Sequence, residues 1–348
     1  MIKISSSNSL RITMLKLISI VMVVFIHSYR TGNSNLFFFN FEFTIVNILS
    51  RVAVPLFFLI SSYLLYLKPF NWGKNLRKKT KTLLIPYILV NTIWILLFLI
   101  IGYFSFVRQY LPSDGSLNFN IYSWRIKDWI SYYFYYPFDY PLWFLKDLFI
   151  LNIFSRFIKN IVDRFPTAIL IIISIIWIGG IWLPNPVNIL NLNMQSFVFF
   201  VLGYYAAKFR LEFENVDRLN KYGVITAYIF SSIIVLLFKN IYALSAVNIL
   251  IGIVFWIRIS IYFSNKNKEL LKYQSKFSML TFFIFAFHEL TLGIIVKFTS
   301  LIYKNNNILE FIFFIANPII VISICILLAN IITKISPRVA SVISGNRV

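Results

Sequence analysis

Two histidines, the only ones in the chain, are the side chains whose type and spacing most directly suggest chemistry. His27 follows Lys16 by eleven residues, and His288 follows Lys276 by twelve. At the rise of an α-helix, each imidazole lies about 16–18 Å beyond a basic flank. We therefore expect both rings at nearly the same depth, around or just beyond the middle of a membrane. An imidazole there can act as a general base on a hydroxyl group, or it can simply link helices by hydrogen bonds.

Other ionisable side chains also fall inside apolar stretches, where they are costly and so suggest function. These residues are Arg51, Lys146, Asp147, Arg258, Glu289 and Lys297. Glu289 is placed to orient either histidine, which would favour the imidazolium form. The guanidinium of Arg258 either binds the phosphates of a donor or extends to the membrane surface. We expect the ammonium of Lys297 to extend to the membrane surface.

Two further polar pairs have a structural and a functional interpretation. Lys146 and Asp147 form either a local ion pair or part of a substrate site. Ser61 and Ser62 either line a cavity or mark a close contact between helices, where serine is common.

The composition identifies the class of protein that must position these groups. Hydrophobic residues make up 59% of the 348 residues and charged residues 13%, and the mean hydropathy is +0.79. Soluble domains are about 45–50% apolar and about 25% charged. The sequence thus predicts an all-α, multi-pass membrane protein with a single domain over 1–348 and no separate soluble domain. The single cysteine, Cys325, and the two histidines exclude an internal disulfide, a cysteine-rich metal site and a three-histidine metal site. We expect no metal.

About ten apolar stretches have the length of a membrane span. They cover residues 10–29, 46–67, 82–104, 142–158, 167–183, 194–208, 223–239, 242–262, 279–301 and 310–333. The first lacks a signal-peptide cleavage pattern after its apolar run, so we interpret it as a retained helix.

The distribution of lysine and arginine between the predicted loops agrees with ten spans and with both termini in the cytoplasm. The net charge is +21. The predicted cytoplasmic segments hold 23 lysines and arginines, and the predicted external segments hold six, namely Arg30, Arg108, Arg125, Lys127, Lys239 and Lys304. This alternation follows the positive-inside rule. It explains the basic composition better than nucleic-acid binding, for which the chain has no motif.

The longest predicted external loop, about 105–141, is rich in tyrosine and tryptophan. These rings form either an aromatic belt at the membrane surface or a platform on which sugar rings stack.

Six segments resemble the membrane acyltransferase 3 family, in the family's order. Lys16 to His27 resembles its Arg-x10-His signature, with lysine in place of arginine. The stretch from Arg51 to Leu65 resembles its VPLFFxxSGYLL pattern. The remaining four segments are LLIPY at 83–87, PLWFLK at 141–146, FFVLGYY at 199–205 and FIFAFH at 283–288.

The resemblance implies an integral-membrane O-acyltransferase of the cell envelope, with no permanently bound cofactor. Such an enzyme moves an acyl group, most often acetyl from acetyl-CoA, to a hydroxyl of a surface polysaccharide or its lipid-linked precursor. His27 corresponds to the catalytic base and Lys16 to the basic residue near the donor. Arg51, Trp143 and Lys146 correspond to cavity residues, and His288 to a late-helix histidine.

The chain departs from the family pattern at four positions, one of which is Leu148, where a subgroup of the family has a glutamate. Lysine at 16 loses the bidentate phosphate pairing of arginine. Thr13 stands where an acidic residue is frequent, and Ser62 replaces a glycine. These departures leave the donor open between acetyl-CoA and succinyl-CoA, and a succinyl carboxylate would require an additional cation such as Arg258 or Lys146.

Two questions of mechanism and class also stay open at this level. The acyl group passes to the acceptor directly or through an acyl-histidine. The alternative function is a non-catalytic polysaccharide export component, which ten helices with a few buried charges also fit. A glycan polymerase or ligase is disfavoured because the loop at 105–141 has no histidine. A bias toward Ile, Asn, Lys and Phe suggests an AT-rich bacterial genome and hence the plasma membrane.

Overall fold

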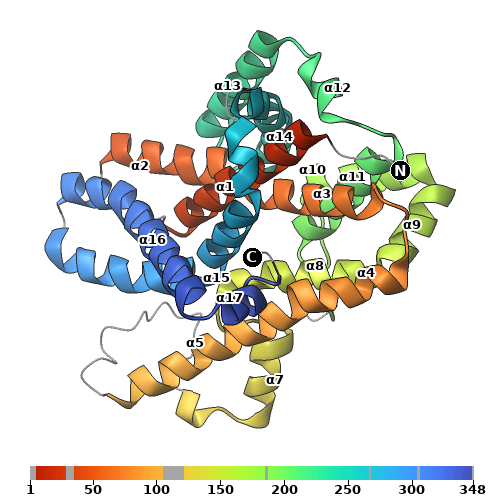
Figure 1. The fold of residues 1–348 in the computed structure, drawn as a ribbon. Helices are drawn as coiled ribbons and strands as arrows, with labels where there is room; N and C mark the ends of the chain where they lie inside the picture. The colour runs from red at the N-terminus through yellow and green to blue at the C-terminus, as the bar shows by residue number, and fades with distance from the viewer. Residues whose placement is uncertain are drawn as a thin grey trace.

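The computed structural model describes residues 5–28, 35–104, 121–184, 187–265, 268–303 and 306–346 (Figure 1). Within these ranges the regular elements are all helices, which confirms the predicted all-α class. Residues 105–120 of the predicted external loop, and the basic residues Arg30, Arg108 and Lys304, lie outside the described residues.

Six candidate membrane spans stand out in the described ranges by length and apolar composition. They are Ser6–His27, Leu36–Tyr66, Trp72–Tyr103, Tyr242–Phe263, Glu269–Tyr303 and Asn307–Ile335. A bent pair of shorter helices, Ser155–Arg164 and Pro166–Gly179, would make a seventh. The chain is therefore a multi-pass membrane protein, and the predicted count of ten with cytoplasmic termini stays a prediction.

The long spans are built from several helical pieces. The first is α1 (Ser6–His27). The second comprises α2 (Leu36–Phe43), π-helix η1 (Thr44–Leu49), 3₁₀-helix η2 (Ser50–Val52) and α3 (Ala53–Tyr66). The third comprises α4 (Trp72–Lys79), π-helix η3 (Thr80–Leu84) and α5 (Ile85–Tyr103). The last three contain α14 (Tyr242–Asn265), α15 (Gln274–Tyr303) and α16 (Asn307–Ile335).

Shorter helices make up the rest of the described chain. They are α7 (Ile126–Phe134), α8 (Trp143–Ile153), α9 (Ser155–Arg164), α10 (Pro166–Gly179), α11 (Met194–Lys208), α12 (Phe213–Asp217), α13 (Lys221–Leu237) and α17 (Pro337–Ile343). Short 3₁₀ turns η4 (Ile121–Ser123), η5 (Tyr140–Leu142) and η6 (Lys268–Tyr273) connect them.

The predicted span at 142–158 differs from the structure. Helix α8 ends at Ile153, and α9 follows as a separate amphipathic helix with basic residues along its polar face. Proline at the start of α10 cannot continue the preceding helix, and the axes of α9 and α10 differ by 114°. An amphipathic basic helix of this kind is typical of a membrane surface.

Helix α1 lies at the centre of the helix bundle (Figure 1). It packs against α3, α14 and α15, and the close neighbour of α3 on its other side is α11. In Figure 1 the start of α1, α9 and α12 lie at one end of the molecule, and the end of α15 and the start of α16 lie at the opposite end. The first group comes from basic segments predicted to be cytoplasmic, and the second flanks a segment predicted to be external.

Arg11 fixes the start of α1 to two other helices. Its guanidinium donates two hydrogen bonds to the Asp217 carboxylate of α12, at 2.6 and 2.8 Å. It also donates to the Ser260 hydroxyl and the Ile257 carbonyl of α14, both at 2.9 Å. Only 2% of Arg11 is exposed. The sequence predicts a basic residue at the membrane surface, but Arg11 is a buried residue that clamps α1 to α12 and α14.

Candidate active site

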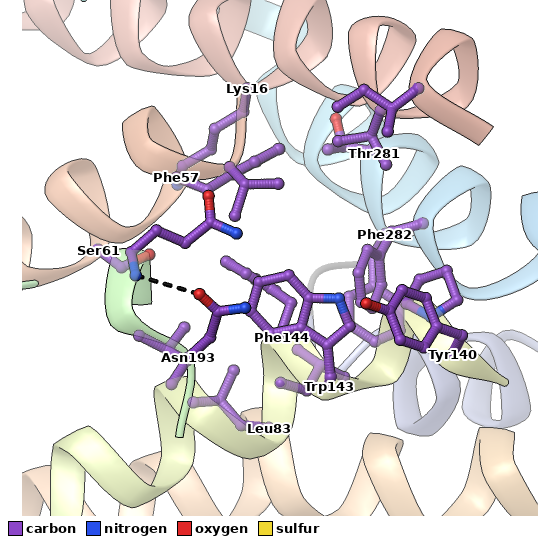
Figure 2. Close-up of a pocket in the computed structure, with 18 of the residues that line it drawn as sticks. Lys16, Phe57, Ser61, Leu83, Tyr140, Trp143, Phe144, Asn193, Thr281 and Phe282 are labelled. Carbon is purple, nitrogen blue, oxygen red and sulfur yellow. Dashed lines mark hydrogen bonds between the residues drawn. The ribbon is translucent and has the colours of Figure 1, made fainter. Parts of the chain in front are cut away.

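A cavity of about 430 Å³ runs beside α1 and contains most of the predicted site residues. Its lining side chains converge from α1, α3, α8, α15 and the start of α11 (Figure 2). Lys16 and His27, both on α1, line the same cavity. The eleven residues between them correspond to about 16 Å of helix. The cavity therefore connects a basic group at the middle of α1 with an imidazole at the C-terminal end of that helix.

His27 is the last residue of α1 and is held by a carboxylate from α15. Its Nδ1 lies in ion-pair contact with Oε2 of Glu289. A carboxylate on Nδ1 selects the tautomer that carries its hydrogen there, so the Nε2 lone pair is left for a substrate. The ring also lies at the C-terminal end of α1, where the helix dipole is negative. This arrangement is typical of a general base that is oriented by a carboxylate.

His288 lies directly behind His27 rather than in the cavity lining. The two ring centroids are 5.2 Å apart, so the rings are neighbours, and their depth in the membrane stays a prediction. His288 is fully buried, and its Nδ1 lies 2.9 Å from the carbonyls of Ile284 and Phe285 in its own helix. His288 therefore supports the His27 ring and does not line the substrate space.

Arg51 enters the cavity from an irregular turn of the second span. It lies in η2, directly after the π-helix η1, and such irregularities within long helices are frequent at functional sites. Its Nη2 donates to the Asn47 side chain at 2.9 Å. The guanidinium lines the same cavity as His27 and Tyr140, so the structure unites the two predicted groups Arg51 and His27.

Ser61 and Trp143 also line the cavity, as predicted, and Phe57 and Phe144 add apolar wall (Figure 2). Trp143 stacks on Phe58 with 6.2 Å between ring centroids. Ser62 does not line the cavity; it is buried where α3 contacts α11.

Lys146 lies in a second cavity, of about 330 Å³, next to the first. Its ammonium donates to the carbonyls of Asn191 at 2.9 Å and Tyr135 at 3.2 Å and lies 3.6 Å from Asp147. Asp147 in turn accepts hydrogen bonds from the Asn193 backbone and the Ser196 hydroxyl. The predicted Lys146–Asp147 pair is present, and it joins α8 to the segment before α11.

Arg258 and Lys297 lie away from both cavities. Arg258 donates from Nε to the Leu219 carbonyl at 3.3 Å and is not among the cavity-lining residues. Lys297 lies nine residues beyond His288 along α15, roughly 13 Å in helical rise. The geometry therefore gives no support to a donor-binding role for Arg258.

Several lining residues were missed by sequence reasoning. Tyr140, Asn193, Gln195, Ser278 and Thr281 all line the main cavity. The Asn193 side chain accepts from the Gln195 backbone at 3.1 Å, which caps the start of α11 (Figure 2). Tyr140 belongs to the aromatic loop that the sequence does single out. The others are single polar residues at helix ends, and local sequence carries no signal for them.

His27, His288 and Glu289 form a group, among the described residues, whose donor atoms lie within 4.8 Å of one another. Two histidines and a glutamate are also a ligand set of catalytic zinc sites. The contact between His27 and Glu289 would have to open to admit an ion. That no metal takes part stays a prediction.

Comparison with known proteins agrees with this geometry. Residues 10–329 match the family described as an acyltransferase domain. The chain is 26% identical over 369 aligned positions to the succinoglycan biosynthesis protein ExoH of Rhizobium meliloti (strain 1021), with 97% of this chain and 92% of that protein covered. No solved structure matches the chain.

Proposed function

The chain belongs to the acyltransferase family, whose domain covers residues 10–329, and from this premise we propose its reaction. It is an acyltransferase that transfers groups other than aminoacyl groups. We propose that it moves an acetyl or succinyl group from acyl-CoA to a hydroxyl of a bacterial cell-surface polysaccharide or of its lipid-linked precursor, in the plasma membrane. The resemblance to a succinoglycan biosynthesis protein over nearly the whole chain supports a polysaccharide acceptor.

One observation carries the proposal: His27, held by Glu289, lines the same cavity as Lys16. Acyl transfer from a thioester requires a base at the acceptor hydroxyl and a site for the anionic donor. A cation near the predicted cytoplasmic start of the cavity can pair with coenzyme A phosphates. A carboxylate-oriented imidazole at the opposite end can remove the hydroxyl proton.

The steps of direct transfer follow from this arrangement. His27 Nε2 takes the proton as the acceptor oxygen attacks the thioester carbonyl and forms a tetrahedral oxyanion. Arg51 lines the same cavity, and in this proposal its guanidinium stabilises that negative charge. When the carbon–sulfur bond breaks, the imidazolium returns the proton to the sulfur, so the products are the acyl ester of the acceptor and coenzyme A with a free thiol. Glu289 stabilises the imidazolium between these two steps.

An acyl-histidine relay is the second route through the same site. His27 itself would attack the thioester, and the acceptor hydroxyl would then attack the acyl-imidazole. The relay would allow donor and acceptor to bind in turn from opposite faces. A rapid quench with acyl-labelled donor and no acceptor separates the routes, because only the relay puts label on the protein.

The test of the function uses membranes that contain the protein together with acetyl-CoA or succinyl-CoA labelled in the acyl group. We expect label in the polysaccharide or lipid-linked fraction with one of the donors, and its loss in His27→Ala. Arg258→Ala is the matched control, because its side chain lies outside both cavities. Full transfer by His27→Ala would overturn the base assignment. No transfer from either donor by folded wild-type protein would favour the export alternative.

A further inference from the structure

We propose that the second cavity, the outer pocket, binds an uncharged sugar ring of the acceptor polysaccharide; this inference rests on the proposed function. The outer pocket is about 330 Å³, which falls within the range of small-ligand sites. It lies between the aromatic segment around 135–143 and residues 182–183 and 188–194. It shares Tyr140, Trp143 and Asn193 with the main cavity, so a molecule in one is next to a molecule in the other.

Five of the thirteen residues that line the outer pocket are aromatic. Tyr135, Tyr136 and Tyr140 are each exposed, by 42%, 53% and 58%. Trp182 faces them from the other segment, and its Nε1 donates to the Leu192 carbonyl at 2.8 Å, which fixes the indole plane. A pyranose ring presents an apolar face of C–H groups and a rim of hydroxyls. Amphipathic rings such as tyrosine and tryptophan match both.

The polar groups of the outer pocket hold its walls together. Lys146 donates to the carbonyls of Tyr135 and Asn191, and the Asn191 side chain donates to the Tyr135 carbonyl at 3.0 Å. Asn191 adopts a left-handed φ of 45°, a conformation that asparagine tolerates better than most residues. The Asn188 side chain donates a hydrogen bond to the Leu192 carbonyl and accepts one from the Leu192 backbone nitrogen. The opposing walls are therefore tied together before any ligand binds.

The charge of the outer pocket selects the class of ligand. Lys146, the charged residue in its lining, is bonded to two carbonyls and lies beside Asp147. Its charge is compensated within the protein, and the remaining polar side chains are amides and phenols. A neutral, hydroxyl-rich ring fits this lining better than the phosphates of coenzyme A or a succinyl carboxylate.

The position of the outer pocket relative to the base completes the argument. Tyr140 lines both cavities, and its ring centroid lies 6.4 Å from that of His27. A sugar stacked beside Tyr140 would therefore present a hydroxyl toward the imidazole. The donor side, with Lys16, Ser278 and Thr281, belongs to the main cavity alone.

The experiment measures acyl transfer to the host strain's surface polysaccharide after alkaline removal of its esters. We expect Tyr136→Ala to raise the acceptor KM by roughly three- to tenfold, the effect of one lost aromatic contact, with the KM for acyl-CoA unchanged. Tyr103→Ala is the matched control, since that tyrosine is exposed at the end of α5 and lines neither cavity. Trp182→Phe provides a second variant that keeps a ring but loses the bond to Leu192.

The outcomes separate the two proposals. If wild-type protein transfers acyl groups and both variants keep the wild-type acceptor KM, the outer pocket is not the acceptor site, although the proposed function stands. An equal rise in the KM for donor and acceptor would also overturn the inference, since it would indicate a general distortion. If wild-type protein transfers no acyl group to any fraction, the proposed function fails first.

Discussion

His27 occupies the last residue of α1, where the helix dipole and the Glu289 carboxylate both favour a positive charge on its ring. Two consecutive residues of α15 contact His27. The Glu289 carboxylate contacts its Nδ1, and the His288 ring packs against its imidazole. Consecutive residues of a helix point about 100° apart. The two side chains therefore meet His27 from different directions, which restricts its rotation.

We predict that Glu289→Gln lowers kcat strongly and leaves the KM for donor and acceptor nearly unchanged. Glutamine keeps the size of the side chain but removes the charge that stabilises the imidazolium. A general base without its orienting carboxylate loses rate by on the order of 10²- to 10⁴-fold. Steady-state transfer by purified protein measures this, with the exposed Glu269→Gln as the control. A wild-type kcat in Glu289→Gln would show that the carboxylate has no catalytic part.

Arg11 illustrates a residue whose role is structural although its type suggests a membrane flank. Its guanidinium is buried and bonded to Asp217, Ser260 and the Ile257 carbonyl. Removing one partner of a buried ion pair leaves an uncompensated charge.

We therefore expect Asp217→Asn to destabilise the protein by about 3 kcal/mol, as for other broken buried ion pairs. Thermal unfolding in detergent measures the change as a lower Tm. Asp217→Glu is the control, because it retains the carboxylate. An Asp217→Asn protein that unfolds at the wild-type temperature would mean that the clamp does not stabilise the fold.

At the scale of elements, two motif segments far apart in sequence prove to be one contact. Gly203 of α11 lies against α3, and a Cβ built on it would approach the Leu59 carbonyl oxygen to 2.4 Å and the Ser62 Cβ to 2.7 Å. Only a glycine lets these backbones come so close, and serine in place of glycine at 62 is still accommodated. This contact aligns α3, which carries Ser61, with the start of α11, which carries Asn193.

We expect Gly203→Ala to separate α3 from α11 and to lower both the Tm and the transfer activity. The added methyl group meets backbone, which cannot rotate away as a flexible side chain can. Gly73→Ala in α4 is the matched control, since the nearest atom to its Cβ would be 4.0 Å away. Equal stability of the two variants would contradict a tight contact at Gly203.

Short helices also decide where the cavities form. Helices α8, α10 and α11 have 11, 14 and 15 residues, fewer than the roughly 20 that cross a bilayer. Described non-helical residues between α10 and α11, among them Trp182, Asn188 and Asn191, line the outer pocket. Non-helical backbone in a membrane protein is tolerated where it lines a polar cavity. The segments that are weakest as membrane spans are thus the ones that surround the proposed acceptor site.

At the scale of the whole molecule, the distribution of basic residues predicts which ends face the cytoplasm. The chain has one cysteine, Cys325, which is fully buried, so single-cysteine reporters can be placed elsewhere on a Cys325→Ala background. This tests the predicted ten spans at the short helices, where length and composition alone do not settle the count.

We expect Val187→Cys to react in intact cells with a thiol reagent that does not cross membranes, and Arg164→Cys and Leu219→Cys to react only after lysis. Val187 lies in a predicted external segment, and Arg164 and Leu219 lie in predicted cytoplasmic ones. Tyr103→Cys is the positive control, because it lies at the end of the predicted span 82–104, next to the predicted external loop, and is 76% exposed. Labelling of all three short-helix reporters from one side would reject the ten-span topology.

The amino-acid sequence by itself determined the helical class, the membrane setting and the principal chemical groups. Those properties depend on composition and on spacing along one helix, and both are local. Lys16 and His27 share a helix, so their separation of about 16 Å follows from the rise per residue. The prediction that His27 and His288 lie at the same depth followed from their similar distances to a basic residue on each helix.

The tertiary structure decided which of the candidate groups meet. Glu289 was an equal candidate for either histidine, and only the packing of α15 on α1 brings it to His27 Nδ1. The break between α8 and α9, the placement of Arg258 outside the cavities and the wall built by Asn191 and Tyr135 likewise depend on contacts between distant segments. No local pattern encodes such contacts, because each depends on how two helices pack and on which faces they bury.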